Sequence, residues 1–379
     1  MKKYINWLAY ISLAIAFVIG YFQFSDHKKN EVSHLEFIIE NEFLLTEFDS
    51  ETFSVLKNDS LFGYLSIGEA QGYGGPLSIA VLADTSGVIR ETELINSYES
   101  ASFVAKLFNK KYFDQFSDKV VNSRFIIKED LDAVSGATVS SIAIAEAARD
   151  ASFKIAENNL KMEIPHIERI FQFAAKEAIV LLLFILGVVF VFLRKKKLKY
   201  ISLFLGLVFI GFMFNASLSI THFGRLFLGY FPDIYSHFIW WLLMAGTLTI
   251  IIGWGRNVYC TALCPFHASQ VLLNKISGIN IKLSLKQAKL LNKTPSFLLW
   301  LSLMLIFLSS NPTISSYEPF AMLFSLEGVG VQWYILPASL IGALFFSNFF
   351  CRFFCPVGAT FKWVQKQRKQ VKKLISNER

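Results

Sequence analysis

The chain has 379 residues, of which 54% are hydrophobic and 17% charged, and its mean hydropathy is +0.45. This composition excludes an ordinary soluble globular protein and indicates a membrane protein. The net charge of +8 does not require a nucleic acid as partner, because most of the basic excess flanks apolar segments.

Hydropathy is distributed unevenly along the chain. Residues 27–165 are of mixed polarity, whereas residues 178–350 contain several long apolar runs. This division predicts an aqueous domain joined to a membrane domain. The expected parts are a transmembrane anchor over 1–26, an aqueous domain over 27–165, a membrane domain over 166–360 and a basic cytoplasmic tail over 361–379.

The first apolar run covers residues 5–21 and follows Lys2 and Lys3. It is long enough to span a bilayer. A cleaved signal peptide is the alternative, but no clear small-residue cleavage site precedes the first charges at residues 26–29. We therefore expect an uncleaved anchor, with the next segment translocated outward.

Residues 27–165 are expected to form a compact α/β domain. The pattern over 35–45 is typical of a helix, and short β-branched or aromatic runs between turn residues predict strands. The predicted strands cover 53–56, 61–67, 77–83 and 88–94.

A glycine-rich turn, Gly72-Tyr73-Gly74-Gly75-Pro76, lies between two of these strands. Glycine permits positive φ and a close approach to the backbone, so a flat isoalloxazine ring could lie against it. An ordinary hairpin turn explains the same residues equally well.

The stretch from Asp132 to Thr138 precedes a strongly helical run over 139–156. Ser135, Gly136 and Ala137 are small enough to let a ligand approach the backbone, and Thr138 falls at the helix start. A phosphate is favoured there by unpaired amides and the helix dipole. The alternative is a simple helix cap, a common role of Ser and Thr.

The pattern D-x-x-S-G-A-T resembles the flavinylation motif of FMN-binding domains, which also carry a similar G-Y-G-G-P segment ahead of it. The resemblance implies that Thr138 is joined to FMN by a phosphoester bond, made by a separate flavin transferase. It implies a recognition motif of Asp132, Ser135, Gly136 and Ala137, and cofactor contacts from Gly72, Tyr73, Gly74 and Gly75. The loop after the fourth strand makes Glu99 a further candidate, although Ala101 stands where the family often has proline, which leaves its role open.

Five more apolar segments follow, and with the anchor they predict six transmembrane helices. They cover 171–193, 200–221, 237–254, 296–309 and 332–350. Their flanking segments 2–3, 194–199, 255–295 and 351–379 hold 21 basic residues, whereas the two short opposite loops hold only Arg225. Because cytoplasmic loops accumulate Lys and Arg, both termini are expected inside and the flavin domain outside the bacterial cytoplasmic membrane.

All four cysteines lie in two copies of one motif, Cys260-x-x-x-Cys264-Pro265 and Cys351-x-x-x-Cys355-Pro356. Each copy follows the inner end of a predicted span, so a parallel repeat would bring four thiolates together. A disulfide is improbable in a reducing compartment. Zinc favours C-x2-C spacing, whereas iron-sulfur clusters accept varied spacings, and both alternatives stay open on the residues alone.

The two cysteine motifs resemble those of NosR-like and polyferredoxin-type membrane proteins, which are described as binding 4Fe-4S clusters. A NosR-type chain usually continues into a soluble ferredoxin domain, and the expectation here is that this domain is lacking, because no cysteine follows Cys355.

The combined expectation is an α/β extracytoplasmic FMN-binding domain on an all-α polytopic membrane domain. The chain is expected to act as an electron-transfer component rather than a self-contained enzyme, serving an unidentified donor and an extracytoplasmic reductase. A redox sensor or regulator and a zinc-stabilised scaffold are the alternatives. Because the hydrocarbon layer is about 30 Å thick, a carrier such as haem or quinone near His222 and His237 is also expected.

Overall fold

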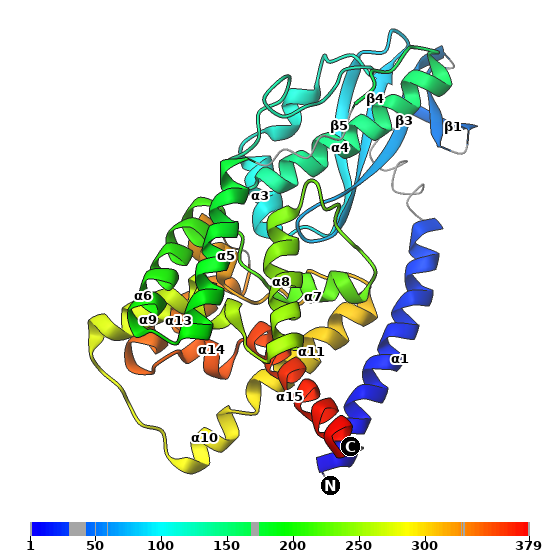
Figure 1. Ribbon diagram of the computed structural model, residues 1–379. Helices are drawn as coiled ribbons and strands as arrows, with labels where there is room; N and C mark the ends of the chain where they lie inside the picture. The colour runs from blue at the N-terminus through cyan, green and yellow to red at the C-terminus, as the bar shows by residue number, and fades with distance from the viewer. Residues whose placement is uncertain are drawn as a thin grey trace.

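The computed structural model describes residues 2–29, 43–49, 51–58, 60–167, 174–326, 328 and 330–377. A sheet domain lies at one end of the molecule and a bundle of helices at the other (Figure 1). The N-terminal helix α1 (Lys2–Lys29) runs beside the bundle, and both ends of the chain lie far from the sheet.

The sheet has five antiparallel strands in sequence order. They are β1 (Phe43–Asp49), β2 (Thr52–Lys57), β3 (Ser60–Gln71), β4 (Pro76–Asp84) and β5 (Ile89–Ser97). The four predicted strands are thus confirmed. Residues 43–45 of the predicted helix over 35–45 belong to β1, so that prediction is wrong there; its remaining residues lie outside the described part of the chain.

Helix α4 (Thr138–Lys154) crosses one face of this sheet (Figure 1). Its alanine-rich side packs against alternate residues of β4, and Gly68 of β3 lets the helix backbone come close, because any Cβ there would meet the carbonyl oxygen of Ala147. The other face of β4 packs on β2 and β3 through Ala80 and Leu82. The helices of this domain therefore lie beside a purely antiparallel sheet rather than between parallel strands. The shorter helices are α3 (Ala101–Asn109) and the 3-10 turn η1 (Tyr112–Phe116).

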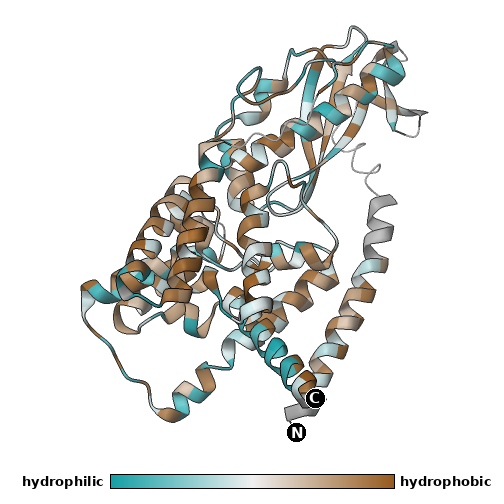
Figure 2. Cartoon of the chain, in the orientation of Figure 1, coloured by the Kyte–Doolittle hydropathy of each residue, from teal (hydrophilic) through white to brown (hydrophobic). Residues whose placement is uncertain are grey.

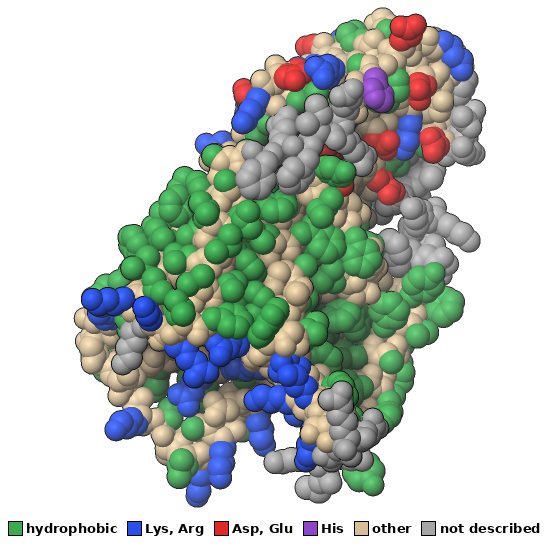
Figure 3. All heavy atoms as spheres, viewed as in Figure 1, with side chains coloured by type: hydrophobic (Ala, Val, Ile, Leu, Met, Phe, Trp, Pro, Cys, Tyr) green, Lys and Arg blue, Asp and Glu red, His purple; other side chains and the backbone are tan. Residues whose placement is uncertain are grey.

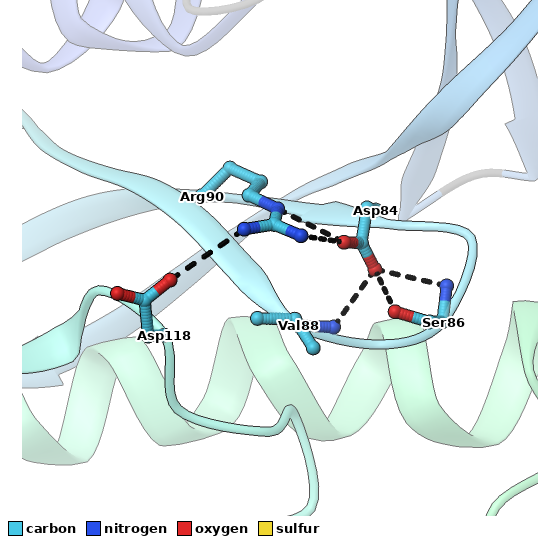
Figure 4. A network of polar contacts seen from close by, with 5 residues as sticks. All are labelled: Asp84, Ser86, Val88, Arg90 and Asp118. Atoms are coloured by element: carbon cyan, nitrogen blue, oxygen red, sulfur yellow. Dashed lines mark hydrogen bonds and ion pairs between the residues drawn. The ribbon is translucent and has the colours of Figure 1, made fainter.

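The β4–β5 turn is organised by Asp84 (Figure 4). Its carboxylate accepts hydrogen bonds from the backbone N–H of Ser86 and of Val88, at 2.9 and 3.0 Å, and from the guanidinium of Arg90 at 2.6 Å. Burial alone would raise the pKa of Asp84, but these bonds to its charged form outweigh it and lower the pKa to about 2.

We expect Asp84→Asn to lower the local free energy of opening of the β4–β5 hairpin by about 1 kcal/mol at neutral pH. Because the folded-state pKa lies below the ordinary value of 3.8, the stabilisation is present above that pH and disappears as the pH falls through about 2. Hydrogen exchange across this pH range measures it. Asp118→Asn is the matched control, since Asp118 is 84% exposed and lies 3.5 Å from Arg90. An equal effect of both variants would contradict the prediction.

The helical region contains a helix within every predicted apolar segment, and most of these helices are coloured as hydrophobic in Figure 2. The helices of this region, inside and outside those segments, are α5 (Ala175–Leu193), α6 (Lys196–Leu205) with the π-helix η3 (Gly206–Met213), α7 (Ile220–Phe227), α8 (Phe238–Trp254), η4 (Tyr259–Leu263), α9 (Pro265–Ser277), α10 (Leu285–Leu291), α11 (Thr294–Ser309), α12 (Phe320–Ser325), α13 (Gln332–Phe345), α14 (Phe349–Phe353) and α15 (Pro356–Asn377).

Within the described residues, two helices are long and apolar enough to cross a membrane, Ala175–Leu193 and Leu285–Ser309. The apolar helices Trp7–Phe22, Phe238–Trp254 and Gln332–Phe345 are shorter. The sheet domain and the helical region are therefore established, but six transmembrane helices are not.

One predicted segment ends early. The helix expected over 200–221 stops at Met213, after eight residues of π-helical winding, and the backbone then runs unwound to Ser219. The amides of residues 214–216 still donate to carbonyls of residues 209–211, whereas the later peptide groups of this unwound stretch, residues 214–219, can bind partners outside a helix.

Helix α1 packs closely on α11. A Cβ at Gly20 would meet the carbonyl oxygen of Phe307. In addition, Ser310 Oγ donates a 2.9 Å hydrogen bond to the carbonyl of Gly20. Small residues that allow such backbone approach are typical of helix pairs in membranes. The segment predicted as an anchor is thus an integral part of the bundle.

Candidate flavin and iron-sulfur sites

The loop before α4 holds Thr138 at the helix start. Gly136 has φ +79, a left-handed conformation that favours glycine. Ser141 holds both sides of this loop, because its Oγ accepts a hydrogen bond from the N–H of Val134 at 3.0 Å and donates one to the carbonyl of Ala137 at 3.1 Å. The N-cap residue Ala137 gives no side-chain hydrogen bond to the first amides of α4, so these amides can face a ligand.

Thr138 lines a cavity of about 150 Å³ that lies between the sheet domain and the helical region. The sheet domain contributes Tyr73, Phe103 and residues 136–140, and the helical region contributes residues such as Asn215, His237 and Trp240. The upper end of α8 meets α3 and the start of α4 in Figure 1. The cavity therefore has walls from both parts of the chain.

The helical wall of this cavity carries buried polar atoms without a hydrogen-bond partner among the described residues. They are Trp240 Nε1 and Asn215 Oδ1, on side chains 5% and 7% exposed. An unpaired buried polar atom costs about 1–3 kcal/mol, so such groups mark a place where a polar ligand is expected. The ring of FMN carries carbonyl oxygens and ring nitrogens that match these groups, so the residues present fit the cofactor.

The glycine-rich turn has a different position from the one expected. Tyr73 reaches the cavity, whereas Gly72, Gly74 and Gly75 are buried where a Cβ would collide with Glu99, Tyr98 or the loop at Pro312. The three glycines thus allow close packing against residues 98–99 of the same domain, and Gly74 and Gly75 also approach the loop at Pro312 and Thr313.

Glu99 lies beneath this turn. Its carboxylate accepts the backbone N–H of Tyr73 at 2.5 Å and of Gly74 at 3.2 Å. Burial raises the pKa of Glu99, although these bonds and Arg225 oppose the shift. Glu99 therefore supports the turn. Asp132 is exposed, and its backbone N–H donates to Gln115.

Arg225 of α7 clamps the two parts together, a role that sequence analysis missed. It is fully buried, and its guanidinium donates to the carbonyls of Gly72 at 2.9 Å and Tyr73 at 2.6 Å. Burial lowers the pKa of Arg225 to about 10, while Glu99 acts to raise it, so the side chain stays charged at neutral pH. One signal in the sequence points to this role: Arg225 is the single basic residue in the two short loops, 222–236 and 310–331, that are predicted to lie outside the membrane.

The four cysteines line one cavity of about 380 Å³. In each motif the first cysteine sits on a short helical turn, η4 or α14, and the second immediately precedes a proline that starts the next helix. Gln270 joins the two motifs, because its Nε2 donates to Cys351 Sγ at 3.0 Å and its Oε1 accepts the N–H of Phe350 at 2.8 Å. The repeat therefore brings all four thiols to the lining of one cavity.

The four thiols of this cavity are the donor set that a 4Fe-4S cluster takes. Across the described ranges, no group of three His, Cys, Asp or Glu side chains is close enough to bind one metal ion. Zinc needs four ligands on one atom, whereas the thiolates of a 4Fe-4S cluster bind different iron atoms and stand farther apart. Lys362 and Arg352 also line the cavity and supply positive charge beside the thiolates.

Leu218 lines both cavities. It belongs to the unwound stretch, which therefore separates the flavin cavity from the cysteine cavity. The two sites are neighbours, although the sequence placed them on opposite membrane faces.

Residues 72–152 match the FMN-binding domain family, and residues 236–284 and 334–373 match the 4Fe-4S binding domain family. The chain thus carries an FMN-binding domain and a 4Fe-4S binding domain.

Three relatives are similar to parts of the chain. Protein NirI of Paracoccus denitrificans is 26% identical over 170 residues, which is 40% of this chain and 24% of NirI. Regulatory protein NosR of Pseudomonas aeruginosa is 31% identical over 140 residues, 35% of this chain and 19% of NosR. NosR of Stutzerimonas stutzeri is 25% identical over 200 residues, 46% and 27% of the two chains. The matched part of the chain spans 19–27% of each relative's length, so the similarity to NosR and NirI holds for individual domains.

Proposed function

We propose that this protein transfers electrons across a bacterial cytoplasmic membrane, between a 4Fe-4S cluster held by Cys260, Cys264, Cys351 and Cys355 and an FMN joined to Thr138. The observation that carries the proposal is the common wall of the two cavities at Leu218. When bound, FMN supplies one- and two-electron chemistry and the cluster supplies electron exchange with a donor.

The distribution of side chains supports the membrane orientation. In Figure 3, Lys and Arg gather at the end of the helical region away from the sheet domain, and a hydrophobic surface lies between them and the acidic side chains of that domain. Apolar side chains such as Leu182 and Phe204 are 66% and 61% exposed, as lipid-facing residues are. The positive-inside rule then orients the basic end toward the cytoplasm and the flavin domain outward, with six spans.

The proposal needs no haem or quinone between the centres. That expectation rested on a full membrane thickness between them, whereas Arg225 docks the flavin domain on the bundle and the unwound stretch brings the cavities together. His237 lines the flavin cavity, and His222 packs against Tyr73 with ring centroids 4.7 Å apart. Both histidines are better assigned to the surroundings of the flavin.

A separate flavin transferase, a cytoplasmic low-potential donor and an extracytoplasmic acceptor reductase complete the proposal as partners. The word "regulatory" in the name of the NosR relatives favours a redox sensor as second candidate. Sustained flavin turnover with an acceptor distinguishes the first function from the second.

The test uses flavinylated protein in sealed vesicles free of quinone, with a membrane-impermeant low-potential reductant on the side of the basic face. We expect the flavin, exposed on the other side, to be reduced, and protein with Cys264→Ser to show no reduction. Flavin absorbance is the measurement, and any reduction in vesicles with the Cys264→Ser protein reports leakage of the reductant. Flavin that stays oxidised in the wild-type protein while the cluster is reduced would contradict the proposal.

A further inference from the structure

The unwound stretch between the cavities contains one peptide group whose C=O and N–H are each hydrogen-bonded to a different tyrosine. Tyr73 Oη donates to the carbonyl oxygen of Ser217 at 2.8 Å. The amide N–H of Leu218, which belongs to the same peptide group, donates to Tyr259 Oη at 2.8 Å. A trans peptide directs its C=O and N–H to opposite sides, so the two tyrosines reach this group from opposite directions.

The outer ends of this bridge lie in the two sites. The ring of Tyr73 lines the flavin cavity together with Thr138. Tyr259 lines the cysteine cavity, directly precedes Cys260, and its carbonyl accepts the N–H of Cys264 at 2.8 Å. Hydrogen bonds and covalent bonds thus connect the wall of one site to two ligands of the other.

The bridge is buried and well defined. Tyr259 and Leu218 are each 1% exposed. Burial and the nearby carboxylate of Glu99 raise the pKa of Tyr73, so its hydroxyl keeps the proton that it donates. The peptide group is available because the preceding helix ends at Met213, and its buried C=O and N–H would otherwise lack partners.

We propose that Tyr73, the 217–218 peptide and Tyr259 form the electronic bridge between the flavin and the cluster. This inference rests on the proposed function. In each transfer the cluster loses one electron and the flavin gains one, or the reverse, and no covalent bond forms or breaks. The reductant is a low-potential one-electron donor on the cytoplasmic side.

The test compares Tyr73→Phe and Tyr259→Phe in the full chain with both cofactors loaded. Each change keeps the ring and removes one hydroxyl. Tyr112→Phe and Tyr317→Phe are matched controls, because these hydroxyls also donate to backbone carbonyls, of Ser141 at 2.8 Å and Phe354 at 2.7 Å, near one site but off the bridge.

We expect a several-fold slower transfer from cluster to flavin in each bridge variant after rapid reduction, and rates like the wild type in both controls. The midpoint potentials of the two centres, measured by redox titration, should stay unchanged. Unchanged potentials would exclude a smaller driving force as the cause of the slower transfer. The double variant should be slowed by less than the product of the single effects, because the broken bridge is one route. Bridge variants with the wild-type rate, or a slower rate explained by a shifted potential, would overturn the bridge. A wild type without any transfer would instead overturn the proposed function.

Discussion

Thr138→Val is expected to abolish covalent flavin. The phosphoester needs a side-chain hydroxyl, and valine keeps the branched shape of threonine while removing that oxygen. Thr138 is partly exposed at the first position of α4, where it lines the cavity between the domains. The change therefore removes the attachment atom without altering the core of the sheet domain.

The measurement is flavin fluorescence of the denatured protein on a gel, after co-expression with a flavin transferase. Thr138→Ser is the matched control, because it restores the hydroxyl and should recover a fluorescent band. Iron content in the same samples separates lost attachment from misfolding, since the cysteine site is distant in sequence. A Thr138→Val protein that keeps the wild-type band would show that another residue carries the flavin.

Local signals in the sequence were sufficient for both cofactor motifs. The small residues before Thr138 and the repeated CxxxCP motif each specify a turn followed by a helix start, which the structure confirms at α4, α9 and α15. Such short-range patterns depend on backbone geometry that neighbouring residues determine.

The arrangement between the domains could not be predicted in the same way. Hydropathy treats residues 200–221 as one apolar segment and cannot register that the helix ends at Met213, since the freed backbone groups are satisfied by Tyr73 and Tyr259, which are distant in sequence. The clamp by Arg225 likewise depends on carbonyls more than 150 residues away in the chain, at separations of 153 and 152. Tertiary partners of this kind leave no periodic pattern.

Replacing any one of the four cysteines by serine is expected to remove iron to a similar, nearly complete degree. Each motif supplies only two thiolates, and one cavity contains all four. Gln270 belongs to α9, which starts directly after Cys264, and it bonds to Cys351 and to the backbone of Phe350 in the second motif. A disturbance in one motif therefore also reaches the other. A pair of thiolates alone completes neither a 4Fe-4S cluster nor a tetrahedral zinc site.

Iron and zinc analysis with the visible spectrum of purified protein measures this loss. Thr261→Ala is the matched control: it changes a residue between Cys260 and Cys264 whose exposed side chain donates to the carbonyl of Asn257 and does not line the cysteine cavity, so iron should remain. Because the chain has no other cysteine, any iron retained in a variant reports on this site. Variants of one motif that keep half of the iron would indicate two independent sites, and zinc in place of iron would contradict the cluster. The flavin band provides the check on folding, since Thr138 lies in the other domain and its attachment does not depend on the cysteines.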